Sequence, residues 1–379
     1  MKDEIDFDEI SKKESDKVSI IDIRSESSYE YGHIPGSINV PYEKFDEMIP
    51  NLSKDKEFFV YCKSGVISPE IVDKMTNLGF NTKNISGGYF GWLREHFTDL
   101  DEGEKQLQVE ESLRKKFHKQ IFSKFAKAIN EYELLSPGDK VAVCISGGKD
   151  SMLMAKLFQE LKHHNKFDFE LVFLVMDPGY SKENREIIEN NAQMLGIPIT
   201  VFETKIFDSV FNIEKSPCYL CARMRRGHLY NKAKELGCNK IALGHHYDDI
   251  IETILMGMLY GAQIQTMMPK LKSSNFENME LIRPMYLIRE ADIKAWRDYN
   301  KLGFIQCACK FTDNCSGDSC KLDNTGSKRK KVKNIIAKLA KEDPQIEYNI
   351  FRSVENVNLS TIIAYKDKQG NEHNFKDEY

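Results

Sequence analysis

Residues 146–151 of the sequence, SGGKDS, stand between an apolar run (VAVCI) and a segment with helical periodicity (MLMAKLFQEL). Glycines let backbone N–H groups approach an anion closely, and the N-terminus of a helix adds a favourable electric field. A strand, a glycine-containing loop and a helix in this order are therefore typical of a phosphate-binding loop. An ordinary turn is the alternative, but a turn does not require a strand and a helix on its two sides.

Cys62 occupies a comparable position. It follows the apolar run 57–61 (EFFVY) and begins the loop CKSGVI, after which Ser68 starts a predicted helix. A loop that enters the N-terminus of a helix directs several backbone N–H groups to one point, which favours a thiolate or persulfide anion. Cys62 is therefore a candidate carrier of a transferable sulfur atom, and the alternative is a buried cysteine that only packs.

A third polar segment, 243–249 (LGHHYDD), also follows an apolar run and enters a helical pattern. Ligands bind at the carboxyl edge of parallel sheets, so polar side chains gathered at that edge are well placed to contact one. For His245 and His246, structural hydrogen bonding is the alternative.

The nine cysteines of the chain indicate thiol, metal or redox chemistry, since structural disulfides are rare in the cytosol and no export signal is evident. Cys218 and Cys221 form a CxxC pair, which is a common half-site for zinc or an iron–sulfur cluster because two thiolates can reach one metal centre. Cys307 and Cys309 form a second group.

The composition limits the classes of function. The chain of 379 residues is long enough for two or three packed cores, and its 41% hydrophobic and 30% charged residues are typical of a soluble globular protein. The acidic segment 1–11 lacks the apolar stretch of a signal peptide, so we expect a cytoplasmic protein with no membrane partner. The net charge of −4 gives no general attraction for a polyanion, so any RNA-binding surface must be local. The candidates are Arg223, Arg225, Arg226 and the basic run 328–333, for which a solvated surface is the alternative.

These candidate residues need elements that position them. Apolar runs rich in β-branched and aromatic residues predict two strands of an N-terminal α/β domain, at 18–23 and 57–61. After an acidic linker, apolar residues recur about every four positions from Gln106 to Glu133, which predicts one amphipathic helix. Further strands alternate with helical patterns and predict βαβ units with a parallel sheet. These strands are expected at 140–145, 169–176, 198–202 and 240–244.

The segments DIR at 22–24, GHIPGS at 32–37 and NVP at 39–41 resemble the rhodanese family over roughly the first hundred residues. Cys62 stands where that family has its catalytic cysteine. The resemblance implies a rhodanese-like sulfurtransferase domain in which Cys62 carries a persulfide. Many sulfur-carrying rhodaneses have an arginine where Ile67 stands, so the anion is expected to depend on backbone amides here.

Residues 106–355, approximately, resemble the tRNA 2-thiocytidine synthetase family of pyrophosphatase-loop enzymes. The resembling segments are SPGDKVAVCISGGKDS, PCYLCARMRRGHLY, LGHHYDDIIET and LIRPMYLIRE. The resemblance implies a Rossmann-like (adenine nucleotide alpha hydrolase-like) parallel-sheet domain with ATP, Mg²⁺ and a 4Fe-4S cluster as cofactors. Asp150 would be a catalytic residue that helps to hold Mg²⁺, and Ser146 and Ser151 would contact the pyrophosphate portion of ATP. The implied ATP-binding residues are Ser146, Gly147, Gly148, Lys149, Asp150, Ser151, Asp177, Gly244, His245, Asp248 and Asp249.

In that family a CxxC pair and one distant cysteine hold the cluster and leave one iron without a protein ligand. The resemblance therefore implies Cys218, Cys221 and Cys307 as metal ligands. The family often has a second CxxC where this chain has CxC, so Cys309 is the alternative third ligand. The remaining pair, Cys315 and Cys320, has no secure match, and a zinc site with Cys309, free thiols or a redox pair all stay open.

The resemblances together imply an ATP-dependent tRNA thiolase that forms 2-thiocytidine. A base carbonyl would be adenylated, and sulfur would pass from a Cys62 persulfide through the cluster to the base. The expected partners are tRNA and a persulfide donor such as a cysteine desulfurase, and a homodimer stays open. Thiolation of another RNA base, a small molecule or a carrier protein is the first alternative. A redox or sulfur-sensing module is the second, although a sensor does not need a site for the α-phosphate of ATP.

Four regions are expected. They are a rhodanese-like domain at 1–100, a linker with the amphipathic helix at 101–135, a pyrophosphatase-loop domain that binds ATP and the iron–sulfur cluster at 136–310, and an extension containing cysteine and lysine at 311–379.

Overall fold

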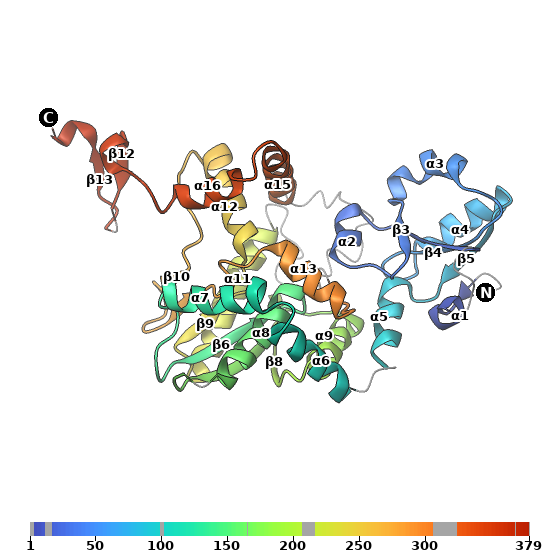
Figure 1. The fold of residues 1–379 in the computed structure, drawn as a ribbon, viewed down its shortest axis with the longest axis horizontal. Coiled ribbons are helices and arrows are strands. Elements are labelled where there is room, and N and C mark those ends of the chain that lie inside the picture. The colour runs from blue at the N-terminus through green and yellow to red at the C-terminus, as the bar shows by residue number, and fades with distance from the viewer. Residues whose placement is uncertain are drawn as a thin grey trace. The chain divides into compact units, whose positions relative to one another are not determined.

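The computed structural model forms two compact units (Figure 1). The first unit contains Met1–His246 and Pro269–Asp323, and the second contains Tyr247–Met268 and Asn324–Tyr379. No helix in the described part of the chain is long and apolar enough to cross a lipid bilayer. The residues described are 4–11, 17–98, 102–164, 166–206, 217–305, 324–367 and 369–378.

The N-terminal part of the first unit is built on a five-stranded sheet in the order β1-β5-β4-β2-β3. All its paired strands are parallel. The central strand β4 is apolar almost throughout, and Phe58, Phe59 and Val60 are all buried, because helices cover both faces of a parallel sheet. The strands are β1 (Glu4–Ile5), β2 (Val18–Asp22), β3 (Ser37–Asn39), β4 (Glu57–Tyr61) and β5 (Asn81–Ile85). The helices are α1 (Phe7–Ser11), α2 (Glu26–Tyr31), α3 (Phe45–Met48), α4 (Ser68–Asn77) and α5 (Gly88–Thr98).

A six-stranded sheet in the order β10-β11-β9-β6-β7-β8 follows in the same unit. Its paired strands are parallel except β10, which runs antiparallel to β11 at the edge. The sequence predicted β6 to β9 but neither β10 nor β11, because each has only three residues (KLK and ELI) and is too short to show periodicity. The strands are β6 (Lys140–Ile145), β7 (Glu170–Asp177), β8 (Ile199–Glu203), β9 (Lys240–Ala242), β10 (Lys270–Lys272) and β11 (Glu280–Ile282). The helices of this part are α8 (Lys149–His163), α9 (Lys182–Met194), α11 (Pro217–Glu235) and α13 (Glu290–Tyr299).

The prediction of a single helix from Gln106 to Glu133 is wrong. The segment contains α6 (Glu102–Arg114), a π-helical turn η3 (His118–Phe122) and α7 (Ser123–Glu131). Its apolar residues recur every four positions, whereas an α-helix has 3.6 residues per turn, so a continuous helix would rotate the stripe by about 40° at each step. Wider turns absorb this rotation, as the bond from Phe117 N to Ser112 O (2.8 Å) illustrates. The whole stripe is therefore buried: Val109, Leu113, Phe117, Ile121, Phe125 and Ile129.

The second unit is mainly helical (Figure 1). Its helix α12 begins at Tyr247, whose ring stacks on Phe351 with centroids 4.5 Å apart. Arg329 Nη1 lies 2.9 Å from Asp249 Oδ1, which links α12 to the basic helix α15. The elements of this unit are α12 (Tyr247–Gly261), α15 (Asn324–Glu342), α16 (Ile346–Ser353), β12 (Ala364–Lys366) and β13 (Glu372–Asn374).

Candidate active sites

The Cys62 loop connects β4 to α4 and surrounds a buried thiol. Cys62 Sγ accepts hydrogen bonds from Gly65 N (3.2 Å) and Ile67 N (3.4 Å), so two backbone N–H groups point at the sulfur, as the loop pattern predicted. Ser68 Oγ lies 3.3 Å from this sulfur and 2.6 Å from Asn84 Oδ1. A hydroxyl has one hydrogen, so Ser68 donates to only one of these partners at a time. The arrangement suits a sulfur atom that carries negative charge.

A pair of glycines supports this loop from outside. Gly88 has a φ of +59°, and a Cβ atom there would lie 2.5 Å from Cys62 O and 2.6 Å from Gly65 N. The next residue, Tyr89, donates from its backbone N to Cys62 O at 2.9 Å. Neither Gly87 nor Gly88 was predicted to belong to the site. The signal was present, since two adjacent glycines before an aromatic helix are typical of a close approach between backbones.

The phosphate-binding loop connects β6 to α8, and Gly148 caps the helix. Ser151 Oγ accepts a hydrogen bond from Ser146 N (3.1 Å) and donates one to Gly148 O (3.0 Å), so this side chain braces the loop. Gly147 has a φ of +84°, and a Cβ atom there would lie 2.5 Å from Ile188 Cγ1. Only glycine fits this position without strain.

The segment 243–249 meets this loop through Gly244, a predicted ATP-binding residue, and through His246, which was not among the predicted ones. A Cβ atom at Gly244 would lie 3.4 Å from both Asp150 C and Ser151 N, which places Gly244 against the start of α8. His246 Nε2 is 4.0 Å from Asp150 Oδ1. The contact follows from the pairing of β6 with β9, because parallel neighbours end at the same edge of the sheet. Asp248 and Asp249 lie in the first turn of α12, which belongs to the second unit.

Lys149 is the buried cation of the site, with a side chain only 3% exposed. Its Nζ lies 3.0 Å from Asp150 Oδ1 and 3.4 Å from Glu290 Oε1. Glu290 ends the segment LIRPMYLIRE but was not among the predicted site residues. An acidic residue in the first turn of a helix is common enough that its type alone carried no signal.

Asp177 ends β7, as expected, but its carboxylate already has several partners. Oδ1 accepts from Gly179 N (2.8 Å) and Tyr180 N (2.6 Å), and Oδ2 lies 2.9 Å from Arg185 Nη1. Burial acts to raise the pKa of Asp177, but these backbone amides and Arg185 outweigh it and lower that pKa. In this structure Asp177 therefore anchors the turn into α9, and its contact with a nucleotide stays a prediction.

The CxxC pair lies near the start of α11, in residues whose side chains are not described. Cys218 and Cys221 are three positions apart, and residues with this spacing lie on one face of a helix. Among the arginines that follow, Arg223 and Arg226 are exposed, while Arg225 Nη2 lies 3.3 Å from Tyr180 Oη. The other cysteines of the predicted cluster and extension lie outside the described residues: Cys307, Cys309, Cys315 and Cys320.

Two other cysteines pack in the core beside the second sheet, as expected from their apolar surroundings. Cys144 and Cys238 are both buried. Burial raises the pKa of the Cys144 thiol to about 12 and also raises that of Cys238. Neutral buried thiols are poor nucleophiles, so these two residues are structural.

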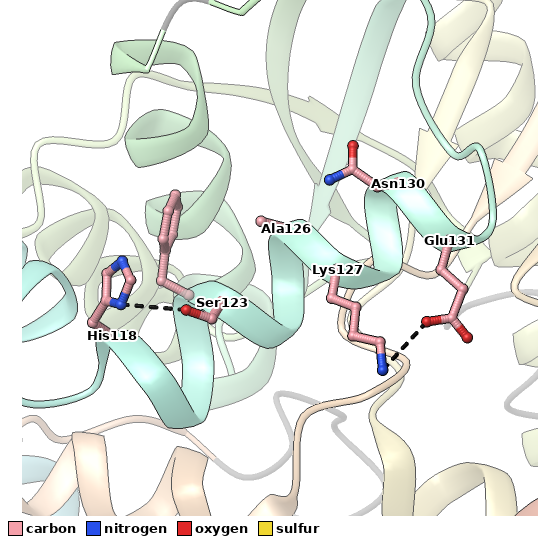
Figure 2. Close-up of a pocket in the computed structure, with 7 residues that line it drawn as sticks. His118, Ser123, Ala126, Lys127, Asn130 and Glu131 are labelled. Carbon is pink, nitrogen blue, oxygen red and sulfur yellow. Dashed lines mark hydrogen bonds and ion pairs between the residues drawn. The ribbon is translucent and has the colours of Figure 1, made fainter.

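A hollow of about 650 Å³ lies beside η3 and α7 (Figure 2). Its lining includes Lys127, which is paired with Glu131 at 3.5 Å, and His118, which lies 3.2 Å from Ser123 Oγ. None of the predicted site residues lines it. We therefore do not assign it to the candidate sites.

Comparisons with known proteins agree with this organisation. Residues 117–312 match the model of the PP-loop domain, and residues 7–95 match that of the rhodanese-like domain. A U34-tRNA thiolase from Methanococcus maripaludis, whose structure contains a [4Fe-4S] cluster, is 22% identical, with 63% of this chain and 82% of that chain covered and a TM-score of 0.48.

Curated relatives are more similar in sequence. The tRNA-cytidine(32) 2-sulfurtransferase of Anaeromyxobacter dehalogenans (strain 2CP-C) is 34% identical over 241 residues, which cover 63% of this chain and 79% of that protein. The protein of the same name from Neisseria meningitidis serogroup C is 38% identical over 198 residues, which cover 51% and 61%. The predicted family and fold class are thus confirmed: the chain belongs to the tRNA-cytidine(32) 2-sulfurtransferase family, the tRNA 2-thiocytidine synthetases of the PP-loop superfamily, and carries a rhodanese-like domain in its N-terminal part.

Proposed function

We propose that this protein uses ATP to replace the 2-oxygen of a tRNA cytidine with sulfur. The observation that carries the proposal is the meeting of the loop 146–151 with Gly244 and His246 at the carboxyl edge of the sheet. This edge offers N–H groups, a buried lysine and carboxylates to one ligand, which suits a nucleotide with its metal ion. The family of the chain supports tRNA cytidine as the substrate.

The chemistry requires activation of a poor leaving group. The base oxygen attacks the α-phosphate of ATP and releases pyrophosphate, and sulfide then attacks the base carbon and displaces AMP. The loop amides and Lys149 hold the charge of the pyrophosphate. Asp150 pairs with Lys149 at 3.0 Å, and Glu290 pairs with both Lys149 (3.4 Å) and Lys294 (3.6 Å). Carboxylate oxygens are the ligands that Mg²⁺ prefers, and Asp150 has the fewer ammonium partners of the two. We therefore assign Mg²⁺ binding to Asp150, with Glu290 as a neighbour.

Cys62 supplies the sulfur in this proposal. A donor such as a cysteine desulfurase transfers a sulfur atom to the thiolate, and the N–H groups of Gly65 and Ile67 stabilise the resulting persulfide anion. Release of the terminal sulfur as sulfide requires two electrons, which thiols supply when they form a disulfide.

We assign the cluster to Cys218 and Cys221, with Cys307 or Cys309 as the third ligand. Their spacing of three positions within α11 supports the assignment of the first two ligands. A cluster held by three cysteines would supply an iron without a protein ligand, to which sulfur could bind. The exposed Arg223 and Arg226 lie on α11 shortly after this cysteine pair and suit the phosphates of RNA. Such a reaction belongs in the cytoplasm, where tRNA is found.

Mass spectrometry of tRNA nucleosides from cells with and without the gene tests this function. We expect 2-thiocytidine to disappear with the gene and to return when the wild-type gene is restored. Loss of a different thiolated nucleoside would show that the enzyme thiolates another base and not cytidine. Unchanged nucleosides would contradict it and favour a small molecule or a carrier protein as substrate.

Metal analysis of protein purified without oxygen tests the cluster. We expect iron and acid-labile sulfide in the wild type and a loss of both in Cys218→Ala and Cys221→Ala. One zinc ion per chain without iron, even after anaerobic reconstitution, would contradict the assignment.

A further inference from the structure

Tyr31, the last residue of α2 in the rhodanese-like domain, reaches into the phosphate-binding loop. The backbone N–H of Lys149 donates a hydrogen bond to Tyr31 Oη at 3.0 Å. A Cβ atom at Gly148 would lie 2.5 Å from the same oxygen, so the hydroxyl is in contact with this glycine. Lys149 Nζ is 4.7 Å from the centroid of the Tyr31 ring. The phenol thus meets the first turn of α8, where a bound phosphate would lie.

The backbone around Tyr31 is held by a residue of the PP-loop domain. Arg297, on α13, donates from Nη1 to Glu30 O at 3.2 Å and also to Tyr31 O. Arg297 is only 3% exposed, so this contact is shielded from water. Burial and the nearby carboxylate of Asp150 raise the pKa of Tyr31, and the phenol therefore stays neutral. A neutral hydroxyl can occupy an anion-binding loop without adding charge to it.

The phenol and a phosphate oxygen require the same hydrogen. The N–H of Lys149 has one hydrogen, and the space beside Gly148 is filled by the Tyr31 hydroxyl. We propose that Tyr31 closes the nucleotide site, so that the docked rhodanese-like domain and the pyrophosphate portion of ATP compete for the loop. The inference rests on the proposed function in one respect, because it requires that ATP binds at residues 146–151.

This competition links the two candidate sites. The backbone N of Tyr89 donates a hydrogen bond to Cys62 O. The hydroxyl of Tyr89 packs against Gly32, the residue after Tyr31, since a Cβ atom at Gly32 would lie only 2.5 Å from it. The persulfide loop and the tyrosine that closes the nucleotide site are therefore parts of one packed domain. Entry of ATP must displace Tyr31, so the apparent dissociation constant for ATP equals the intrinsic constant divided by the fraction of molecules that are open.

Calorimetry with a non-hydrolysable ATP analogue on the full-length protein tests the inference. Tyr31→Phe keeps the ring and removes the oxygen that accepts from Lys149, so we expect binding to become about fivefold tighter, a factor typical of one hydrogen bond. Tyr29→Phe is the matched control, because it lies on the same helix and its hydroxyl bonds to Ser37 O within the rhodanese-like domain. We expect its affinity to equal that of the wild type.

Weaker binding by Tyr31→Phe would make Tyr31 a ligand of ATP and overturn the inference, and so would an affinity equal to that of the wild type. If neither variant nor the wild type bound the analogue, the proposed function would fail together with this inference. Hydrogen exchange of the wild type gives a second, independent measurement. The analogue should increase exchange in residues 26–34 and leave α4 unchanged. Unchanged exchange in 26–34 at saturating analogue would also overturn the inference.

Discussion

The two loops that begin at Cys62 and Ser146 have the same backbone architecture, but their N–H groups bond to different partners. Each starts directly after a central parallel strand and leads into a helix, and each contains a glycine with positive φ, +80° at Gly65 and +84° at Gly147. In the first loop, backbone N–H groups bond to the sulfur of its own first residue. In the second, Ser146 Oγ lies 3.2 Å from Ser151 Oγ, and the N–H of Lys149 bonds to Tyr31.

The comparison shows that the loop architecture supplies N–H groups for an anion, while the first residue decides which anion they bind. A cysteine brings a covalently attached sulfur into the loop. The hydroxyl of Ser146 bonds instead to Ser151 of the same loop. The backbone N–H groups therefore remain for a partner that is not covalently attached and can dissociate. One loop therefore suits a carrier and the other suits an exchangeable nucleotide.

The largest effect on tRNA thiolation should come from removing the Cys62 thiol, which carries the sulfur. With a persulfide as the only sulfur source, we expect Cys62→Ala to abolish tRNA thiolation, because no other residue of its loop can hold the sulfur. ATP binding should stay at the wild-type level, since Asp150 and the second loop are unchanged. Free sulfide should restore activity in the same variant and serves as its control. Normal thiolation from a persulfide donor would remove Cys62 from the reaction.

Asp150→Asn changes the second loop while keeping the volume of the side chain. We expect pyrophosphate release to fall by about 100-fold or more, because the amide binds Mg²⁺ far more weakly than the carboxylate. The thermal unfolding curve should stay close to that of the wild type. Asp73→Asn, an exposed residue on α4, is the control. Pyrophosphate release at the wild-type rate would contradict the role assigned to Asp150.

The shape of the second loop can be tested through two glycines with similar backbone angles. Gly147 and Gly138 have φ of +84° and +82°, but a Cβ atom would meet Ile188 only at Gly147, and at Gly138 no described atom lies within 4 Å. In denaturant unfolding, Gly138→Ala should cost about 1 kcal/mol of backbone strain, and Gly147→Ala about 2–4 kcal/mol because overpacking adds to the strain. Equal losses would show that Ile188 moves aside.

The smallest effect concerns the hydroxyl beside Cys62. Ser68→Ala should slow the loading of Cys62 with persulfide about two- to fivefold, because one of three donors to the sulfur is lost while the two backbone donors remain. Ser64→Ala, an exposed residue of the same loop, should load at the wild-type rate. Loading is measured as the mass shift of the Cys62 peptide after alkylation. An unchanged loading rate in Ser68→Ala would show that the Ser68 hydroxyl donates its hydrogen bond to Asn84 and not to the sulfur.

The sequence alone determined the features that contiguous residues encode. Both loops were located because a strand, a loop and a helix follow one another within about twenty residues, and the apolar periodicity of each element depends only on its own residues. The strands predicted from 18–23 to 240–244 are present, with small shifts at their ends. The same reasoning placed Cys144 in the core.

Only the tertiary structure decided which distant residues meet these loops. Glu290 beside Lys149, Gly88 against the Cys62 loop and Tyr31 on the Lys149 amide come from segments far away in the sequence. The break between α6 and α7 was missed because burial of the whole stripe, and not local helix propensity, selects the wider turn there. Contacts of this kind depend on how complete elements pack, and a local pattern contains no information about the partner that packing brings to it.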